Sequence, residues 1–494
     1  MLDGLPEHML LKLYHYLSSR DLAMLEAVAR HFRQGSQAQA DRGSVQSPWL
    51  TELAAERRVR ADAQGWRLEA RPDQSWKYVL SLSEGGLLAP LPVVSAGDSH
   101  TLVRTTAGRV FAFGKNNAKQ LGLGATAEAT HYGWNAEENR GACEASPLEV
   151  VQLRDHSAAS VSAGCQHSVA LTQDGSLLTW GCSTLMHGPV DLVNRGLLGH
   201  GPVPAEFHVV AAPRRVLGFP SGTRVALVVA GFCHTLCVTA LGEVFSWGKG
   251  EGLGHGDQTD QHTPRRVEAL AEQRVVDVDC DDGISVAVTA AGGLFVWGGF
   301  CSWDDGENLL PERVVFTGGQ RIRRASCSMG FHIGAVDTEG VLYTWGAGEY
   351  DRLGHGNEET GYYPRAVAAL AGERVVTVQC AGWCTAALTE EGHLYTWGGT
   401  WGGYNGHYEE GEFPHRVGED EGAIVREFSC GGQHTVVVMA SGEVCTFGLG
   451  SSGRLGHGTF GNDGRAVDVD TDPRGWETWE LDIVLPRALE GMGA

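Results

Sequence analysis

The chain has 494 residues, of which 69 are glycine, and a formal net charge of −22 at pH 7. Glycine therefore makes up about 14% of the chain, twice the usual ~7%, yet it lacks the three-residue period of collagen. The apolar content of 42% is that of a globular protein, and no apolar run approaches the ~18 residues of a membrane span. The acidic balance disfavours a surface that binds nucleic-acid phosphates.

The first apolar segment, residues 5–33, has the spacing of two short helices. Pro6 stands where the first helix would begin, because the first helical turn does not need the missing N–H. Ser18 or Ser19 can cap the second helix. The apolar positions of the two helices are Met9, Leu10, Leu13 and Leu17, then Leu22, Leu25, Val28 and Phe32. Helices this short bury little surface alone, so their leucines predict a partner.

The order of these signals is specific. Leu-Pro, an apolar helix, Leu-Ser-X-X-Asp-Leu, Val-X-Arg-X-Phe and a later Trp-Leu follow one another within about 50 residues, and together they resemble the F-box. Ala29 departs from the pattern, since the family often has cysteine there. The resemblance implies docking onto the Skp adaptor of a cullin–RING ubiquitin ligase. The implied adaptor-binding residues are Leu5, Pro6, Leu10, Leu13, Leu17, Leu22, Leu25, Val28 and Phe32. The alternative is a small helical cap that packs on the rest of the chain.

Composition changes near residue 90. Residues 1–90 hold 11 basic and 11 acidic side chains and 6 glycines, so the remaining residues carry all of the −22 and 63 glycines. Two glycines and two prolines within residues 85–92 mark the change. The predicted domains are an F-box-like helical module (1–50), a helical extension and linker (51–90) and a repeat domain (91–494).

A repeat dominates residues 91–494. Trp-Gly or Phe-Gly recurs with gaps of 67, 67, 50, 48, 52 and 50 residues, and a glycine stands five positions before every one of the seven aromatics. A histidine stands thirteen positions before the aromatic in five copies, whereas Ile284 and Cys384 take that place in the other two. Leu-Gly-X-Gly follows the aromatic in five copies. A fixed period of this length predicts a repeat architecture.

Each copy has the pattern of short strands. In residues 166–181, two β-prone runs flank an Asp-Gly turn, and glycine supplies the positive φ that such a turn needs. Units of about 50 residues cannot bury their own sheets, so they must pack against one another, and a closed ring protects their edges. Seven copies predict seven blades. Residues 484–489 match the segment that precedes a Val-rich strand in other copies, and Leu91–Gly97 resembles that strand. The two ends are therefore expected to complete one blade together.

The motifs Ala-Gly-X-X-His-Thr/Ser, Asp-Gly-X-Leu-X-X-Trp-Gly and Leu-Gly-His-Gly resemble the repeat of the regulator of chromosome condensation family. The resemblance covers about 400 residues and implies a mainly β fold, a seven-bladed β-propeller preceded by a small all-α F-box-like domain. Equivalent positions on different blades cannot converge on one ion, so the repeat histidines and tryptophans are predicted to be structural. These are His100, His167, His234, His332, His434, Trp180, Trp247, Trp297, Trp345 and Trp397.

A substrate-binding surface is expected on the loops. The two 67-residue gaps contain insertions, residues 125–146 and 182–196, and insertions in repeats map to one face that is often the binding face. The candidate contact residues are Tyr132, Trp134, Met186, Trp303, Trp401 and Tyr404, whose side chains are enriched in interfaces. The alternative is that these side chains only fill loops. The negative charge favours a partner with a basic segment.

An adaptor-binding module before a large binding platform predicts a substrate-recognition subunit of a Skp–cullin–F-box type ubiquitin ligase. We find no motif for catalysis, metal binding or a cofactor, and we expect no direct partner among nucleic acids or membranes. The alternatives are a nucleotide exchange factor for a small GTPase and a non-catalytic scaffold. A relative of the plant UV-B photoreceptor is disfavoured, because only Trp383 resembles its Gly-Trp-Arg-His-Thr motif. The lack of a signal pattern and the sparse cysteines predict a cytoplasmic or nuclear location.

Overall fold

The computed structural model describes residues 93–105, 107–124, 143–183, 194–202, 209–299, 308–329, 331–399, 411–418, 423–440, 442, 444–456 and 477–479. All of them belong to the second of two units into which the chain divides, Ala89–Ala494. The F-box-like segment and the predicted boundary at residue 90 lie outside the described residues, so both stay predictions.

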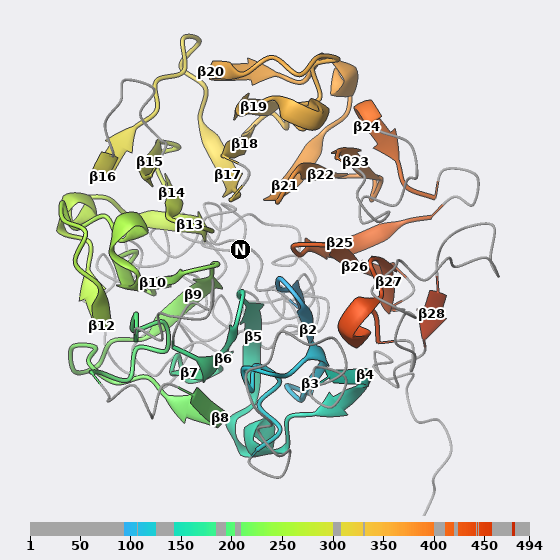
Figure 1. The fold of residues 1–494 in the computed structure, drawn as a ribbon. Coiled ribbons are helices and arrows are strands. Elements are labelled where there is room, and N and C mark those ends of the chain that lie inside the picture. The colour runs from blue at the N-terminus through green and yellow to red at the C-terminus, as the bar shows by residue number, and fades with distance from the viewer. Residues whose placement is uncertain are drawn as a thin grey trace, which may run out of the picture. The chain divides into compact units, whose positions relative to one another are not determined.

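The described unit is a seven-bladed β-propeller, with seven four-stranded sheets arranged around an axis (Figure 1). Blade 1 contains β1 (Val94–Ala96), β2 (His100–Arg104), β3 (Val110–Lys115) and β4 (Cys143–Glu149), and blade 2 contains β5 (Ala158–Ala163), β6 (His167–Thr172), β7 (Leu177–Cys182) and β8 (Val209–Arg215). Blade 3 contains β9 (Val225–Ala230), β10 (His234–Thr239), β11 (Val244–Gly248) and β12 (Gln261–Arg266). Blade 4 contains β13 (Val275–Cys280), β14 (Ile284–Thr289), β15 (Leu294–Gly298) and β16 (Asn308–Arg313).

The other three blades have the same order. Blade 5 contains β17 (Ile322–Cys327), β18 (His332–Asp337), β19 (Leu342–Gly346) and β20 (Gly361–Ala366), and blade 6 contains β21 (Val375–Ala381), β22 (Cys384–Thr389), β23 (Leu394–Gly398) and β24 (Gly411–Arg416). Blade 7 contains β25 (Val425–Cys430), β26 (His434–Met439), β27 (Val444–Gly448) and β28 (Glu477–Trp479). Short 3-10 helices lie in the connections: η2 (Val151–His156), η4 (Gly250–Gly252), η5 (Glu268–Leu270), η6 (Glu349–Asp351), η7 (Ala368–Leu370) and η9 (Ser451–Gly453).

The first strand of each blade lies nearest the axis and the fourth lies outermost (Figure 1). Because neighbouring strands are antiparallel, the first–second turn and the third–fourth connection of a blade leave the sheet at the same end. We call this end of the propeller the loop face. Both insertions join third to fourth strands, since β3 ends at Lys115 and β4 begins at Cys143, and β7 ends at Cys182 and β8 begins at Val209.

The expected completion of one blade by the two chain ends stays a prediction, because residues 484–489 lie outside the described residues. Val94–Ala96 pairs with His100–Arg104 in the first sheet, and the last sheet has its own inner strand and its own outer strand, Glu477–Trp479. Among the described strands, every sheet is therefore built from four consecutive ones, because short connections favour pairing between neighbours in sequence. Each described Pro-Arg segment lies in the outer strand of the same blade as the Trp-Gly dipeptide that precedes it. Pro264 in β12, for example, follows Trp247 in β11 of blade 3.

The glycine prediction is confirmed. All seven glycines before the aromatics have positive φ, between 76° and 92°, in the turn from the second to the third strand. A second glycine role concerns space rather than the turn. A Cβ atom on Gly354, in the Leu-Gly-His-Gly loop of blade 5, would lie 2.7 Å from Nε1 of Trp397 in blade 6. In the five repeats whose preceding loop the structure describes, the aromatic thus packs beneath a loop of the preceding blade.

Side chains on the inner strands connect neighbouring blades. In six of the seven seams, a side-chain oxygen accepts a hydrogen bond from a backbone N–H of the next inner strand. The acceptors are Ser95, Ser162, Asp279, Ser326, Gln379 and Ser429. Val229 occupies this position at the seam between blades 3 and 4. Each such bond contributes about 0.5–1.5 kcal/mol and sets the position of one blade against the next.

The seam between blades 4 and 5 contains three carboxylates on one side of β13. Asp277 accepts from the Ala325 N–H (3.3 Å), Asp279 from the Cys327 N–H (3.1 Å) and Asp281 from the Met329 N–H (2.8 Å). Since the residues alternate on both strands, the three carboxylates form a ladder along β17. Burial raises the pKa of Asp277 to about 6 and the pKa values of Asp279 and Asp281 to about 7.

These shifts predict a specific pH dependence. A raised pKa means that the folded state keeps a proton that the unfolded state releases, so the contribution of Asp279 to stability is lost as the pH rises toward 7. The side-chain amide of an Asp279→Asn variant can still accept the Cys327 N–H but never ionises. We compare the free energy of unfolding of the variant with that of the wild type. This difference should be about 1–2 kcal/mol more in favour of the variant at pH 8 than at pH 5. Urea unfolding at both pH values measures this, with the exposed Asp155→Asn as control. An equal difference at both pH values would contradict the shift.

Candidate protein-binding face

The repeat histidines lie in the seams and are inaccessible to a substrate. Nε2 of each histidine lies 2.7–3.0 Å from a hydroxyl oxygen of the next blade. The pairs are His100 with Ser168, His167 with Thr235, His234 with Ser285, His332 with Thr385, and His434 with Thr101. All five histidine side chains are fully buried. Each contact joins one blade to its neighbour, and the last joins blade 7 to blade 1.

The hydrogen bonds of the hydroxyl groups indicate which ring nitrogen carries the hydrogen. The Thr101 hydroxyl donates its single hydrogen to the Arg454 carbonyl oxygen (2.9 Å), so it must accept from Nε2–H of His434. Burial lowers the pKa of His434 well below its usual value. The pKa values of His100 and His234 fall to about 3 for the same main reason. The rings are therefore neutral at physiological pH and act as structural donors.

Blade 4 is one of the two copies that lack this histidine, and its partner in the next blade differs as well. Ile284 takes the histidine position of blade 4, and Ile333 takes the hydroxyl position of blade 5. Both partners of one seam are thus apolar together, so neither is left buried without a hydrogen bond. In this same seam, Asp277 and Asp279 of β13 and Asp281 just after it accept hydrogen bonds from the backbone of β17 and of the turn that follows it.

The repeat tryptophans form the packing between blades. Trp180, Trp247, Trp297 and Trp397 are fully buried, and Nε1 of each donates to a backbone carbonyl in the loop of the preceding blade at 2.8–3.0 Å. Trp345 is buried as well. None of the buried aromatics can contact a partner protein.

The predicted contact residues fall elsewhere. The adaptor-binding set (Leu5, Pro6, Leu10, Leu13, Leu17, Leu22, Leu25, Val28 and Phe32) and the substrate-binding set (Tyr132, Trp134, Met186, Trp303, Trp401 and Tyr404) lie outside the described residues. Within the described ranges, no cluster of His, Cys, Asp and Glu could hold a metal ion. The helices among the described residues are too short and polar to cross a membrane.

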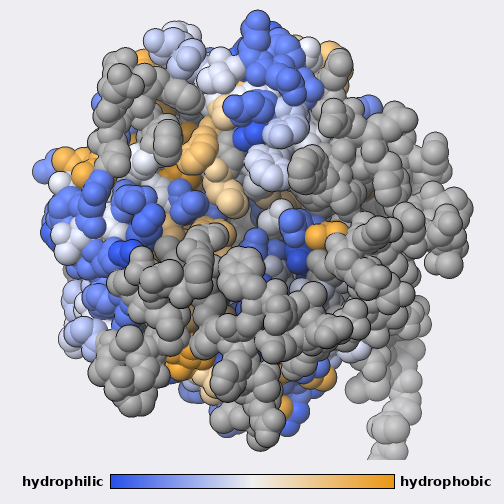
Figure 2. All heavy atoms as spheres, in the orientation of Figure 1, coloured by the Kyte–Doolittle hydropathy of each residue, from blue (hydrophilic) through white to orange (hydrophobic). Residues whose placement is uncertain are grey.

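The described part of the loop face carries an apolar patch that the sequence pattern did not single out. Met329 and Phe331 come from the first–second turn of blade 5, Trp383 from that of blade 6, and Tyr350 from the third–fourth connection of blade 5. These four side chains, which we call the blade 5–6 patch, are 37–40% exposed. The rings of Tyr350 and Trp383 lie 5.8 Å apart. Figure 2 shows hydrophobic residues near the axis of the drawn face, with hydrophilic residues on either side.

The turn between the first and second strands of blade 5 is one residue longer than that of blade 1. From Cys327 at the end of the inner strand to His332 there are five positions, whereas there are four from Ala96 to His100. The extra residue widens the turn, and Phe331 takes a positive φ of 56°. The turn approaches blade 6, because the Ser328 hydroxyl oxygen lies 2.9 Å from Nδ1 of His332 and 3.4 Å from the Gly382 carbonyl oxygen.

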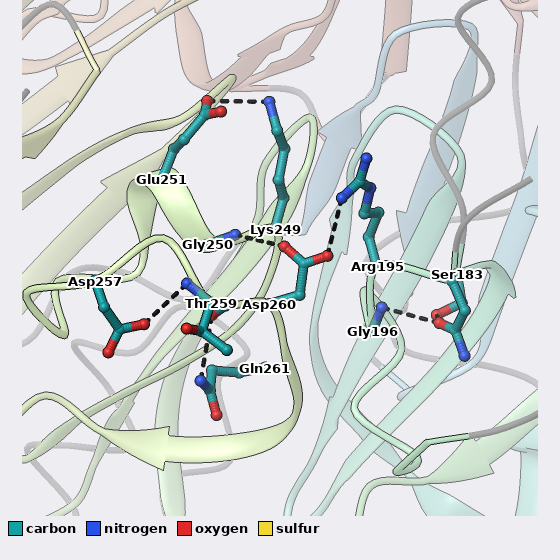
Figure 3. Close-up of polar contacts among 11 residues, drawn as sticks. Ser183, Arg195, Gly196, Lys249, Gly250, Glu251, Asp257, Thr259, Asp260 and Gln261 are labelled. Atoms are coloured by element: carbon teal, nitrogen blue, oxygen red, sulfur yellow. Dashed lines mark hydrogen bonds and ion pairs between the residues drawn. The ribbon is translucent and has the colours of Figure 1, made fainter. Parts of the chain in front are cut away.

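The loops of blades 2 and 3 on the same face have a different character. Arg195 and Asp260 from neighbouring third–fourth connections form an ion pair at 3.1 Å, and the Gly250 N–H donates to the other oxygen of Asp260 at 3.0 Å (Figure 3). Lys249 pairs with Glu251 at 3.0 Å beside them (Figure 3). Since these charges are mutually paired, this region is a polar brace between blades rather than an apolar contact surface.

Sequence comparison agrees with the geometry. A family model described as the regulator of chromosome condensation (RCC1) repeat matches residues 107–171, 242–288 and 339–388, and a second model of this repeat matches residues 158–185. The chain contains RCC1 repeats. These repeats build the seven blades described above.

Several known proteins are similar to the propeller. The chain is 31% identical over 322 residues to the E3 ubiquitin-protein ligase HERC2 of Homo sapiens and 32% identical over 319 residues to the ultraviolet-B receptor UVR8 of Arabidopsis thaliana. Each match covers 62% of this chain, but only 6% of HERC2 and 64% of UVR8. The chain thus spans less than two thirds of either relative.

Two solved structures share the fold. Human WBSCR16 has a TM-score of 0.59 and 26% identity, and the comparison covers 70% of this chain and 85% of that one. Yeast RCC1 (Prp20) bound to Kap60 has a TM-score of 0.56 and 20% identity, with 70% and 79% covered. The resemblance to yeast RCC1 shows the fold alone.

The two tryptophans of blade 6 allow a direct test of this description. Trp397 is fully buried beneath the blade 5 loop, so Trp397→Ala should lower the free energy of unfolding by about 3–5 kcal/mol. Trp383 is 40% exposed, so Trp383→Ala should cost less than about 1 kcal/mol. Urea unfolding of both variants measures the difference. Equal destabilisation would show that Trp383 is a packing residue and that the patch is not a free surface.

Proposed function

We propose that this protein is a non-catalytic substrate-recognition subunit of a Skp–cullin–F-box type ubiquitin ligase. The propeller binds a protein substrate through its loop face, and the N-terminal segment docks onto a Skp-type adaptor. The proposed site of action is the cytoplasm, the nucleus or both. The observation that carries the protein-binding half is the blade 5–6 patch, a group of large apolar side chains exposed on the described part of the loop face.

The chemistry of the described side chains supports a binding role. A general base must be accessible and must gain a proton near neutral pH, yet the repeat histidines are buried and their pKa values are low. Burial also raises the pKa of the Cys237 thiol and that of the Cys384 thiol, which disfavours the reactive thiolate. The exposed aromatic and methionine side chains of the patch are instead typical of protein interfaces.

The adaptor-binding half rests on the N-terminal motif. Leu-Pro, the two apolar helical patterns and Val-X-Arg-X-Phe follow in the order of an F-box within residues 5–33. HERC2 carries the name of a ubiquitin ligase, and its similarity to this chain is confined to 6% of its length. The comparison therefore supports a propeller similar to a part of one ubiquitin ligase.

The proposal predicts that the full-length chain binds a purified Skp adaptor. A variant with both Leu13→Asp and Leu17→Asp should lose the adaptor in a pull-down, because each substitution places a charge in an apolar interface. Leu241→Asp is the matched control, since this leucine is 74% exposed in a turn of blade 3. It should bind like the wild type.

Two results would contradict the proposal. If the wild type does not bind the adaptor, the ligase function is wrong and a scaffold function takes its place. If the wild type accelerates nucleotide release from a small GTPase in an exchange assay while ignoring the adaptor, the chain is an exchange factor.

A further inference from the structure

The blade 5–6 patch contains a pair of aromatic rings from two different blades. Tyr350 belongs to η6 of blade 5 and Trp383 to the first–second turn of blade 6, and their ring planes meet at 41°. Both rings border the same backbone, because a Cβ on Gly399 would lie 3.3 Å from Cβ of Trp383 and 3.5 Å from Cβ of Tyr350. The blades hold the two rings side by side, each with more than a third of its surface exposed.

The charges around these rings are negative. Glu349 and Asp351 flank Tyr350 in sequence, and the Tyr350 N–H donates to Oε1 of Glu358 at 3.0 Å. Three carboxylates against one arginine leave an excess of negative charge beside Tyr350.

The cation next to this pair is already paired with one of these carboxylates. The Arg352 guanidinium lies 5.8 Å from the centre of the Tyr350 ring, but its side chain is only 4% exposed. It pairs with Glu349 at 3.2 Å and donates to the Glu349 carbonyl oxygen at 2.7 Å. One face of the Tyr350 ring therefore meets a buried cation, and the exposed carboxylates of Glu349 and Glu358 lie beside Tyr350.

We propose that the blade 5–6 patch binds a basic peptide segment of a protein partner, with a Lys or Arg side chain over the Tyr350 and Trp383 rings and an apolar side chain against Met329 and Phe331. A cation over an aromatic ring is stabilised by about 0.5–2 kcal/mol, and the carboxylates strengthen this preference. The inference rests on the proposed protein-binding function and gives the chemistry of the recognised segment.

Other occupants fit these charges less well. A second copy of the chain would bring another net charge of −22 toward the same carboxylates. The first 90 residues hold as many acidic as basic side chains, so they offer no net positive charge. Nucleic-acid phosphates would be repelled in the same way as a second copy.

The test is a binding titration of the full-length chain with a fluorescent ten-residue peptide that contains three arginines and one leucine. At 150 mM salt, replacing the three arginines by glutamine should weaken binding at least ~10-fold. Trp383→Ala and Tyr350→Ala should each raise the dissociation constant ~5–10-fold for the arginine peptide. Tyr363→Ala is the control, because this tyrosine is 82% exposed on the outer strand β20, and it should leave the constant unchanged.

The possible failures are distinct. Equal binding by all three variants and the wild type would reveal general attraction to an acidic surface and overturn the proposal, as would the absence of binding to the arginine peptide. A dimer in sedimentation that Trp383→Ala dissolves would assign the patch to a second copy instead. Adaptor binding by the same protein samples separates this test from the ligase function, because loss of peptide binding with adaptor binding intact overturns only the peptide site.

Discussion

Hydrogen bonds between side chains of one blade and the backbone or hydroxyl groups of the next hold the propeller together. A four-stranded blade is too small to bury its own faces, so its stability depends on its neighbours. The inner-strand acceptors, the buried histidines and the tryptophan Nε1 groups each cross a seam between neighbouring blades. Such contacts are repeated from blade to blade, so many small contributions to the free energy of unfolding together stabilise the closed ring.

Two places where the sequence departs from the repeat differ in structure from the other blades. Between blades 4 and 5, Ile284 and Ile333 replace a polar pair, and the carboxylates of β13 provide the hydrogen bonds of that seam. In blade 5 the turn is one residue longer, and it brings Met329 and Phe331 to the surface. The regular parts of the repeat thus build the ring, and the longer turn of blade 5 contributes Met329 and Phe331 to the blade 5–6 patch.

Much of the fold follows from the spacing of a few residues. The aromatic dipeptides and the glycines before them predict seven strand hairpins, and all seven are present with positive φ at the glycine. The blade to which a Pro-Arg segment belongs could not be derived in this way, because the segment fits either the end of one blade or the start of the next. The blade 5–6 patch was missed for another reason. Tyr350 and Trp383 are far apart in sequence, and only the packing of neighbouring blades brings their rings together.

The seam that closes the ring tests the importance of these contacts most directly. His434 of blade 7 lies 2.7 Å from the Thr101 hydroxyl of blade 1, which also donates to the Arg454 carbonyl oxygen. Urea unfolding of His434→Ala, Thr101→Ala and the double variant gives the coupling energy of this pair. If seam bonds hold the propeller closed, the coupling should be about 1 kcal/mol. Strictly additive effects of the two substitutions would contradict the account.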